Sequence, residues 1–376
     1  MRYREFGSTG EKISILGFGC MRFPQTDGKI NEDETLKMVR YSIDNGVNYI
    51  DTAYPYHGGE SELVVGRILK DGYREKVNLA TKLPSWNIKS REDMDKYLNE
   101  QLKKLQTNYI DFYLVHALDE ELWDNLVENG IFDFLDEIKR NKKVRYVGFS
   151  FHDKYEVFEK IIDDYDWDFT QIQYNYIDED YQAGTKGLEY AYKKGLGIVI
   201  MEPLRGGKLV NNLSDDIKNI IKFANTKKSP TKWAFKFLYN KSEIGIVLSG
   251  MSTIEQVIEN IKICDEEGKA NSMTTDEKKI IDNLGEKFKS KIKVDCTACK
   301  YCIPCPRGVN IPGCFEALNN ASMFDDVESV KINMYKFIEE NESDASMCIE
   351  CGKCEAMCPQ HINIIDKLKE VKYTFK

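Results

Sequence analysis

The strongest constraint on the fold is a regular alternation of short apolar runs with helical patterns along roughly the first 265 of the 376 residues. The apolar, β-branched runs occupy residues 16–20, 48–51, 77–82, 110–116, 144–149, 169–174, 197–201 and 244–249. Helical periodicity covers 32–45, 60–70, 91–106, 122–141, 154–163, 186–194, 253–264 and 274–288. Eight strand-then-helix units in about 260 residues predict an α/β fold, a (β/α)8 TIM barrel. A doubly wound sheet is disfavoured because Leu16-Gly-Phe-Gly19 supplies only half of the Gly-x-Gly-x-x-Gly turn.

The last quarter of the chain holds nine of its eleven cysteines, in two tight runs and one outlier. The runs read Cys296-Thr-Ala-Cys299-Lys-Tyr-Cys302-Ile-Pro-Cys305-Pro and Cys348-Ile-Glu-Cys351-Gly-Lys-Cys354-Glu-Ala-Met-Cys358-Pro. The second run has the C-x2-C-x2-C-x3-C-P spacing of cubane iron–sulfur ligands. Zinc usually requires two C-x2-C pairs a dozen or more residues apart. The spacing therefore predicts two 4Fe–4S clusters rather than zinc, and two neighbouring clusters indicate an electron relay.

In this two-cluster pattern, the fourth cysteine of each run binds the other cluster. The predicted ligand sets are Cys296, Cys299, Cys302 and Cys358 for one cluster, and Cys348, Cys351, Cys354 and Cys305 for the other. The first run has two residues rather than three before Cys305, which leaves Cys314 as an alternative ligand. Otherwise Cys314, Cys20 and Cys264 are expected to be buried thiols. Helical periodicity over 329–340 predicts a mainly α-helical cluster domain at 291–376, after a barrel domain at 1–290.

Charge and hydropathy exclude two classes of partner. The net charge of −9, without an arginine-rich stripe, argues against a nucleic-acid surface. Apolar stretches stay well below the roughly 18 residues that cross a membrane. The first ten residues lack the apolar segment of a secretion signal. We therefore expect the protein to be cytoplasmic. In the cytoplasm, clustered thiols bind metals more often than they form disulfides.

Polar residues stand where three consecutive strands are expected to end. Asp51 ends the second strand, with Tyr56 on the following loop, and Lys82 and His116 end the third and fourth. Active sites of (β/α)8 barrels lie at these carboxyl ends. A carbonyl that accepts a hydride needs a proton, and an ammonium beside a tyrosine lowers the pKa of its phenol. We predict that Tyr56 is the proton donor, that Asp51 holds Lys82 beside it, and that His116 hydrogen-bonds the substrate oxygen.

These residues lie in segments that resemble the aldo-keto reductase family over roughly residues 1–290. The similar segments are Asp51-Thr-Ala-Tyr-Pro-Tyr56-His-Gly-Gly-Glu-Ser-Glu62, Ala80-Thr-Lys82, Leu114-Val-His116, Gly148-Phe-Ser150, Thr170-Gln171-Ile, Pro203-Leu and Gly250-Met-Ser-Thr-Ile-Glu-Gln256-Val-Ile-Glu-Asn260. The resemblance implies a nicotinamide dinucleotide across the barrel mouth, with Gln171 and Ser150 near its carboxamide. Its phosphates are expected on the loops after the seventh and eighth strands. The expected cofactor-binding residues there are Leu204, Arg205, Gly206, Lys208, Gly250, Ser252, Gln256 and Asn260.

Three positions depart from the family pattern. Phe151 replaces the usual Asn after the serine, Met201 replaces the aromatic residue that stacks on the nicotinamide, and Ser252 replaces a cation for a 2′-phosphate. NADH is therefore expected at least as much as NADPH. The first two departures also leave room for a flavin.

Three functions follow. The preferred one is reduction of a small aldehyde or ketone by NAD(P)H, or the reverse alcohol oxidation, coupled to electron transfer through the clusters. The first alternative is a flavin-containing oxidoreductase linked to ferredoxin or another electron carrier, because a flavin splits an electron pair. The second is a redox-sensing or electron-transfer protein with an inactive barrel. Trp86 and Trp123 are expected on loops at the mouth.

Overall fold

The computed structural model describes residues 1–224, 228–296, 298 and 300–376. The chain divides into two compact units, Met1–Leu209 with Lys228–Glu277, and Val210–Lys227 with Lys278–Lys376. This division differs from the predicted boundary at residue 290, because α8 (Asp215–Phe223) and most of α11 (Thr275–Lys289) belong to the second unit. An ion pair of 2.8 Å between Lys287 of α11 and Asp216 of α8 joins the two helices.

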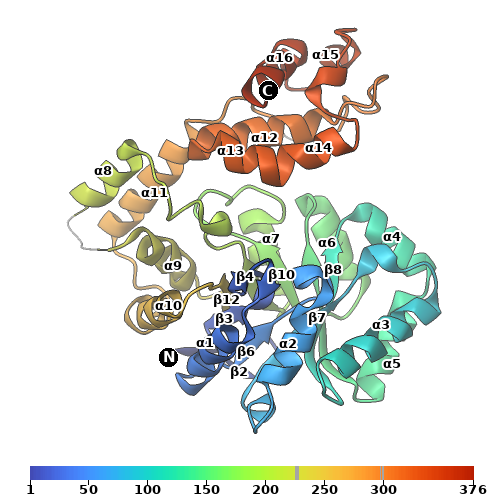
Figure 1. Cartoon of the computed structure of the whole chain (residues 1–376), viewed down its shortest axis with the longest axis vertical. Coiled ribbons are helices and arrows are strands. Elements are labelled where there is room, and N and C mark those ends of the chain that lie inside the picture. The colour runs from blue at the N-terminus through green and yellow to red at the C-terminus, as the bar shows by residue number, and fades with distance from the viewer. Residues whose placement is uncertain (225–227, 297, 299) are drawn as a thin grey trace. The chain divides into compact units, whose positions relative to one another are not determined.

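The first unit is a closed barrel of eight parallel strands, as predicted (Figure 1). The strands are β3 (Leu16–Gly19), β6 (Tyr49–Asp51), β7 (Asn78–Leu83), β8 (Ile110–Leu118), β9 (Val144–Phe151), β10 (Phe169–Gln173), β11 (Gly197–Met201) and β12 (Ile246–Gly250). They follow one another around the barrel in chain order, and β12 pairs with β3 to close it. The surrounding helices are α1 (Glu32–Asp44), α2 (Ser61–Ile68), α3 (Arg91–Lys104), α4 (Glu120–Glu128), α5 (Ile131–Arg140), α6 (Tyr155–Asp164), α7 (Gly184–Lys193), α9 (Pro230–Asn240) and α10 (Ile254–Glu267).

Two helical predictions were wrong or incomplete. The single helix expected over 122–141 is two helices, α4 and α5, because Gly130 adopts a left-handed conformation with φ of 78° between them. Helices α8 and α9, between the seventh and eighth strands, were not predicted. Every residue of α9 from Trp233 to Tyr239 is buried, so its apolar residues surround the helix, interrupted by Lys236, instead of forming a one-sided stripe.

A hairpin of β1 (Tyr3–Glu5) and β2 (Lys12–Ser14) carries a fully buried aromatic side chain into the barrel core. The Phe6 ring packs edge-on against Phe112 at 5.4 Å between centroids. Gly197 and Gly245 leave room for it, because a Cβ at either position would lie 2.5 or 2.6 Å from the ring. A second short hairpin, β4 (Gln25–Thr26) with β5 (Lys29–Ile30), follows β3.

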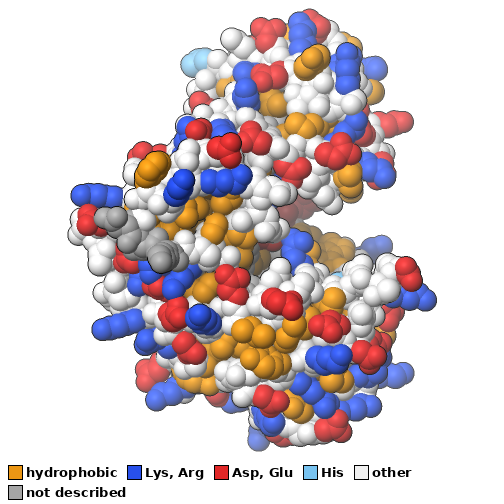
Figure 2. Space-filling model, turned by 60° about the vertical axis from the view of Figure 1, so that its left-hand side comes forward, with side chains coloured by type: hydrophobic (Ala, Val, Ile, Leu, Met, Phe, Trp, Pro, Cys, Tyr) orange, Lys and Arg blue, Asp and Glu red, His pale blue; other side chains and the backbone are white. Residues whose placement is uncertain are grey.

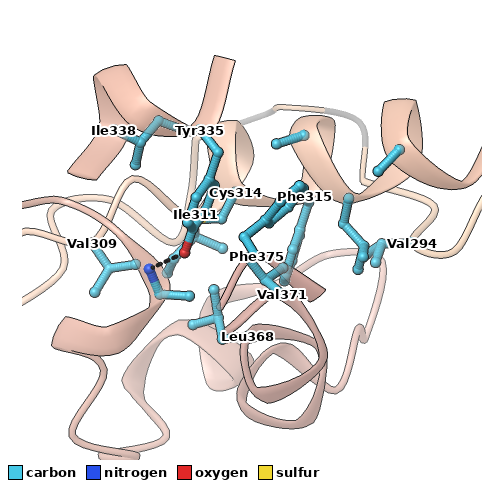
Figure 3. Packing of buried hydrophobic residues seen from close by; sticks show 14 of the residues in the cluster. Val294, Val309, Ile311, Cys314, Phe315, Tyr335, Ile338, Leu368, Val371 and Phe375 are labelled. Atoms are coloured by element: carbon cyan, nitrogen blue, oxygen red, sulfur yellow. Dashed lines mark hydrogen bonds between the residues drawn. The ribbon is translucent and has the colours of Figure 1, made fainter. Parts of the chain in front are cut away.

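The cysteine-rich part of the second unit is helical, as expected. It contains α12 (Ile311–Phe324), α13 (Val327–Val330), a π-helical turn (Lys331–Tyr335), α14 (Lys336–Glu340), α15 (Lys353–Met357) and α16 (Ile364–Thr374). Figure 3 shows its small core, in which Tyr335 stacks on Phe375 at 4.4 Å and its hydroxyl accepts a hydrogen bond from the Ala345 N–H at 3.2 Å. Six of the described cysteines of the two runs pack against this core, so the cysteine loops have a helical support.

The charges of the described surface are mixed. Figure 2 shows basic and acidic side chains interspersed over the visible face, which does not resemble the one-sided basic surface of a nucleic-acid-binding protein. Among the described residues, no helix combines the length and the apolar character needed to span a membrane.

Candidate active site and cluster sites

The four residues expected at the strand ends lie together at one mouth of the barrel. The Lys82 Nζ donates to Asp51 Oδ1 at 2.7 Å, to the Thr52 carbonyl at 2.8 Å and to the Tyr56 hydroxyl at 3.4 Å. The rings of Tyr56 and His116 meet edge-on, with 6.2 Å between centroids. Asp51 and Lys82 are buried, so a fixed ammonium lies behind the phenol oxygen.

A buried polar network that the sequence did not reveal hydrogen-bonds to the backbone of Lys82. The Gln101 amide on α3 donates to the Lys82 carbonyl at 2.9 Å and to Glu62 Oε1 at 2.7 Å. Glu62 also accepts from the Thr81 hydroxyl at 2.7 Å, and the Tyr113 hydroxyl donates to Gln101 at 2.8 Å. Because these groups are fully buried and mutually hydrogen-bonded, they fix the end of β7 that carries Lys82.

The pKa of Tyr56 shifts in the direction opposite to the expected one. Burial raises the pKa of this phenol, and Lys82 offsets only part of the increase. Burial also opposes the charge of Lys82, but Asp51 and Tyr56 outweigh it and raise the pKa of the ammonium. Burial and the charge of Lys82 hold the pKa of His116 well below its usual value. At neutral pH the site therefore presents a protonated phenol, a charged lysine and a neutral imidazole.

The residues expected near a nicotinamide carboxamide are neighbours in the barrel wall. Ser150 on β9 and Gln171 on β10 are register partners, and both are buried. The Gln171 amide donates only to the Met201 sulfur at 3.5 Å, and its Oε1 has no hydrogen-bond partner among the described residues. A buried amide in this state can pair with another amide, so the site fits a carboxamide. Ser150 accepts the Ala117 N–H at 2.7 Å and so holds the backbone next to His116.

Phe151 does not lie at the mouth. Its side chain is fully buried and packs on Phe158 of α6, with 5.0 Å between ring centroids. The replacement of Asn by Phe at this position therefore fills the layer between β9 and α6.

The loops after β11 and β12 are expected to hold the cofactor phosphates. The first contains Leu204, Arg205, Gly206 and Lys208 in and around a 3-10 turn (Arg205–Gly207), and the second contains Ser252 and follows Gly250, the last residue of β12. Arg205 pairs with the buried Asp178, with its Nε 3.1 Å from the carboxylate. The Gln256 side chain accepts the Ser252 N–H at 2.8 Å, and Asn260 donates to Ser249 at 3.0 Å. Several of these polar groups therefore stabilise the loops themselves.

Only one of the two tryptophans lies where it was expected. Trp86, 44% exposed, packs at an angle against His116 with 5.1 Å between ring centroids. It therefore borders the tetrad, which is the group of Asp51, Tyr56, Lys82 and His116. The expectation for Trp123 was wrong. It lies inside α4, fully buried, and its indole N–H donates to Asp164 at 2.8 Å. The apolar face of α4 directs this ring inward.

Two cavities in the cysteine-rich part are each lined by cysteines of both runs. The first, about 260 Å³, is lined by Cys302, Cys305, Cys348, Cys351 and Cys354, so Cys302 borders both cavities. The second is lined by Cys296, Cys302 and Cys358. Cys299, the remaining predicted ligand, lies outside the described residues. Thiols grouped around a space suit a cluster that occupies that space. Among the described residues, no three metal-binding side chains are close enough to share a single ion.

The two cysteine loops fold alike at their start. The Cys296 sulfur accepts the Ala298 N–H, and the Cys348 sulfur accepts the Glu350 N–H, both at 3.4 Å. Ala298 and Glu350 both have left-handed backbones, with φ of 53° and 55°. Such N–H···S contacts stabilise negative charge on a cluster ligand.

Cys314 lies apart from both cavities. It is fully buried in the core around α12, and burial raises the pKa of its thiol to about 12. Because metals bind the thiolate form, this placement favours Cys305 as the fourth ligand of its set.

A (β/α)8 barrel with charged and titratable side chains at its strand ends places the first unit in the class of TIM-barrel enzymes. The chain belongs to the aldo/keto reductase family, whose family model matches residues 15–281. A second family model, the 4Fe-4S dicluster domain, matches residues 295–363. The chain thus combines a barrel of the aldo/keto reductase family with a ferredoxin-type 4Fe–4S domain.

Individual relatives match the barrel. L-galactose dehydrogenase from Arabidopsis thaliana is 29% identical over 278 residues, covering 69% of this chain and 86% of that protein. The holo form of aldo-keto reductase AKR11C1 from Bacillus halodurans superposes with a TM-score of 0.64 at 24% identity, covering 76% and 96% of the two chains. An aldo-keto reductase from Klebsiella pneumoniae in complex with NADPH has a TM-score of 0.61 at 22% identity, covering 75% and 94%.

Proposed function

We propose that the barrel reduces a small aldehyde or ketone with NAD(P)H, or oxidises the corresponding alcohol, and that the second unit carries two 4Fe–4S clusters that exchange electrons with another carrier. The observation that supports the barrel chemistry is the position of Lys82 between Asp51 and Tyr56. A phenol with a fixed ammonium behind it can give up a proton and be stabilised as phenolate. L-galactose dehydrogenase, a relative named for oxidation of an alcohol-bearing sugar, supports this reaction class.

The nicotinamide would supply the hydride, and the side chains of this chain would position the substrate and cofactor and donate the proton. Tyr56 holds a proton at its hydroxyl and donates it to the substrate oxygen as negative charge develops there. His116 is neutral, so its ring has one N–H, which it can donate to the same oxygen. Gln171 would hold the carboxamide. Trp86 beside His116 limits the space open to the substrate.

Cys305 with Cys348, Cys351 and Cys354 would hold one cluster, and Cys296, Cys299, Cys302 and Cys358 the other. When bound, the clusters supply one-electron transfer. The hydride chemistry of the barrel moves electrons in pairs, whereas the clusters move them singly. We therefore propose that hydride transfer in the barrel can proceed without electron transfer through the clusters. The flavin alternative loses one of its two supports, because Phe151 is a core residue and opens no space at the mouth.

The pH dependence of turnover follows from the raised pKa of Tyr56. Reduction needs the protonated phenol, so its kcat/KM should stay level through neutral pH and fall only as the pH passes the Tyr56 pKa, above the usual value of about 10. Alcohol oxidation needs the phenolate and should rise over the same range. The double variant Asp51→Asn/Lys82→Met leaves no buried charge unpaired. Because it removes the ammonium that lowers the Tyr56 pKa, the fall in reduction and the rise in oxidation should both move to higher pH. An unchanged pH dependence of both reactions would contradict the role of Lys82.

Turnover and cofactor analysis of anaerobically prepared protein test the proposed function. With 4-nitrobenzaldehyde as a probe, we expect aldehyde-dependent oxidation of NADPH or NADH by protein that releases no flavin on acid precipitation. Turnover that needs an added or released flavin, or protein that binds neither nucleotide, would contradict it.

A further inference from the structure

The positively charged side chain of Arg22 has no hydrogen-bond or ion-pair partner among the described residues. Arg22 ends a short 3-10 turn (Cys20–Arg22) directly after β3, at the same end of the barrel as the tetrad. The Arg22 side chain is exposed. By contrast, the neighbouring cation Arg205 is committed to Asp178.

Two glycines from separate loops make room for this side chain. A Cβ at Gly206, after β11, would lie 3.0 Å from the Arg22 Nη2. A Cβ at Gly250, the last residue of β12, would lie 3.2 Å from its Cγ and Cδ. A Cβ at either position would require the arginine side chain to shift by a few tenths of an ångström. The Ser252 hydroxyl donates to the Arg22 carbonyl at 2.8 Å and so fixes its backbone to the loop after β12.

These loops follow the seventh and eighth strands, where barrels of this kind bind phosphate groups. Helix α10 begins at Ile254, and the N-terminus of this 14-residue helix adds a favourable field for an anion. The Glu202 carboxylate borders the same place, 3.9 Å from the Gly206 Cβ position, and would repel an anion if no cation were present. Arg22 therefore adds a positive charge beside this carboxylate, where it can offset the repulsion of a phosphate.

We propose that Arg22 binds a phosphate group of NAD(P)H and provides, from the loop after the first barrel strand, the cation that the loop after β12 lacks at Ser252. This inference rests on the proposed function. Arg22 acts by binding the cofactor and takes no part in proton transfer. The Ser252 hydroxyl contributes indirectly, by holding the Arg22 backbone.

The test compares dissociation constants of NADPH and NADH for the full chain, purified anaerobically, by fluorescence titration. Arg22→Met should raise the Kd of NADPH about tenfold or more, the effect of losing a charge-assisted hydrogen bond. Arg22→Lys should fall between Met and wild type. Arg140→Met, which removes an exposed arginine from the end of α5, should change neither constant.

The two nucleotides distinguish which phosphate is bound. A loss confined to NADPH assigns Arg22 to the 2′-phosphate, and an equal loss for NADH assigns it to the pyrophosphate. A folded Arg22→Met variant, with an unchanged melting temperature and unchanged Kd values for both nucleotides, overturns this inference alone. Wild-type protein that binds neither nucleotide overturns the proposed function as well.

Discussion

Tyr56→Phe should lower kcat/KM for carbonyl reduction by about 100- to 10,000-fold, the usual contribution of a positioned general acid. The variant keeps the ring that packs against His116 and removes only the hydroxyl that Lys82 contacts. Because that oxygen is the proposed proton donor, the loss should appear in the chemical step. The Kd of NADPH should stay unchanged, since the expected cofactor contacts lie elsewhere. Steady-state kinetics and fluorescence titration measure the two quantities.

Tyr54→Phe is the matched control, because it makes the same change two residues away. The Tyr54 ring packs edge-on against Tyr97 at 5.1 Å, and Lys104 rather than Lys82 lies over its face. Its turnover should match that of the wild type. Equal turnover in Tyr56→Phe and Tyr54→Phe would remove Tyr56 from its role.

Cys351→Ala should remove about half of the bound iron, since each cluster contains four iron atoms. Cys351 is the exposed sulfur of the first cavity, so its loss opens one cluster and leaves the other set intact. Reduction of the probe aldehyde by NADPH should continue, because the tetrad lies in the other unit. Iron analysis and visible absorbance of anaerobic samples measure the first effect, and the aldehyde assay measures the second.

Cys314→Ala and Cys305→Ala separate cluster ligands from packing cysteines. Cys314 contributes to the core around α12, so its loss should lower the melting temperature while the iron content stays at the wild-type value. Cys305→Ala should lose iron in the same way as Cys351→Ala. Wild-type protein that contains zinc in place of iron would contradict the cluster assignment altogether.

The barrel could be predicted from the sequence because buried parallel strands are short apolar runs that alternate with helices. The prediction was weakest where burial hides periodicity or where one residue sets the local backbone. In α9 the residues from Trp233 to Tyr239 are buried on all sides, which leaves no one-sided apolar stripe, and at Gly130 a left-handed residue separates α4 from α5. The N-terminal hairpin was too short to give a pattern, although it places Phe6 in the core.

The tetrad could be located because each of its members stands at or just after a strand end, and such ends converge at one mouth. The direction of the Tyr56 pKa shift could not be predicted from the sequence, because it depends on how deeply the phenol is buried. The network of Gln101 and Glu62 is also invisible in the sequence, since isolated polar residues on α3 and α2 read as surface positions. Arg22 could have been noticed, because it follows the end of a barrel strand as Tyr56 does.

Isotope transfer tests the central claim most directly. The full chain, with its iron intact, would be supplied anaerobically with 4-nitrobenzaldehyde and with NADPH that carries two deuterium atoms at C4. Mass spectrometry of the alcohol should then show one deuterium at the carbon that bore the aldehyde. An alcohol whose new carbon-bound hydrogen comes from the solvent would show that the electrons do not pass as a hydride from the nicotinamide, and would contradict the account.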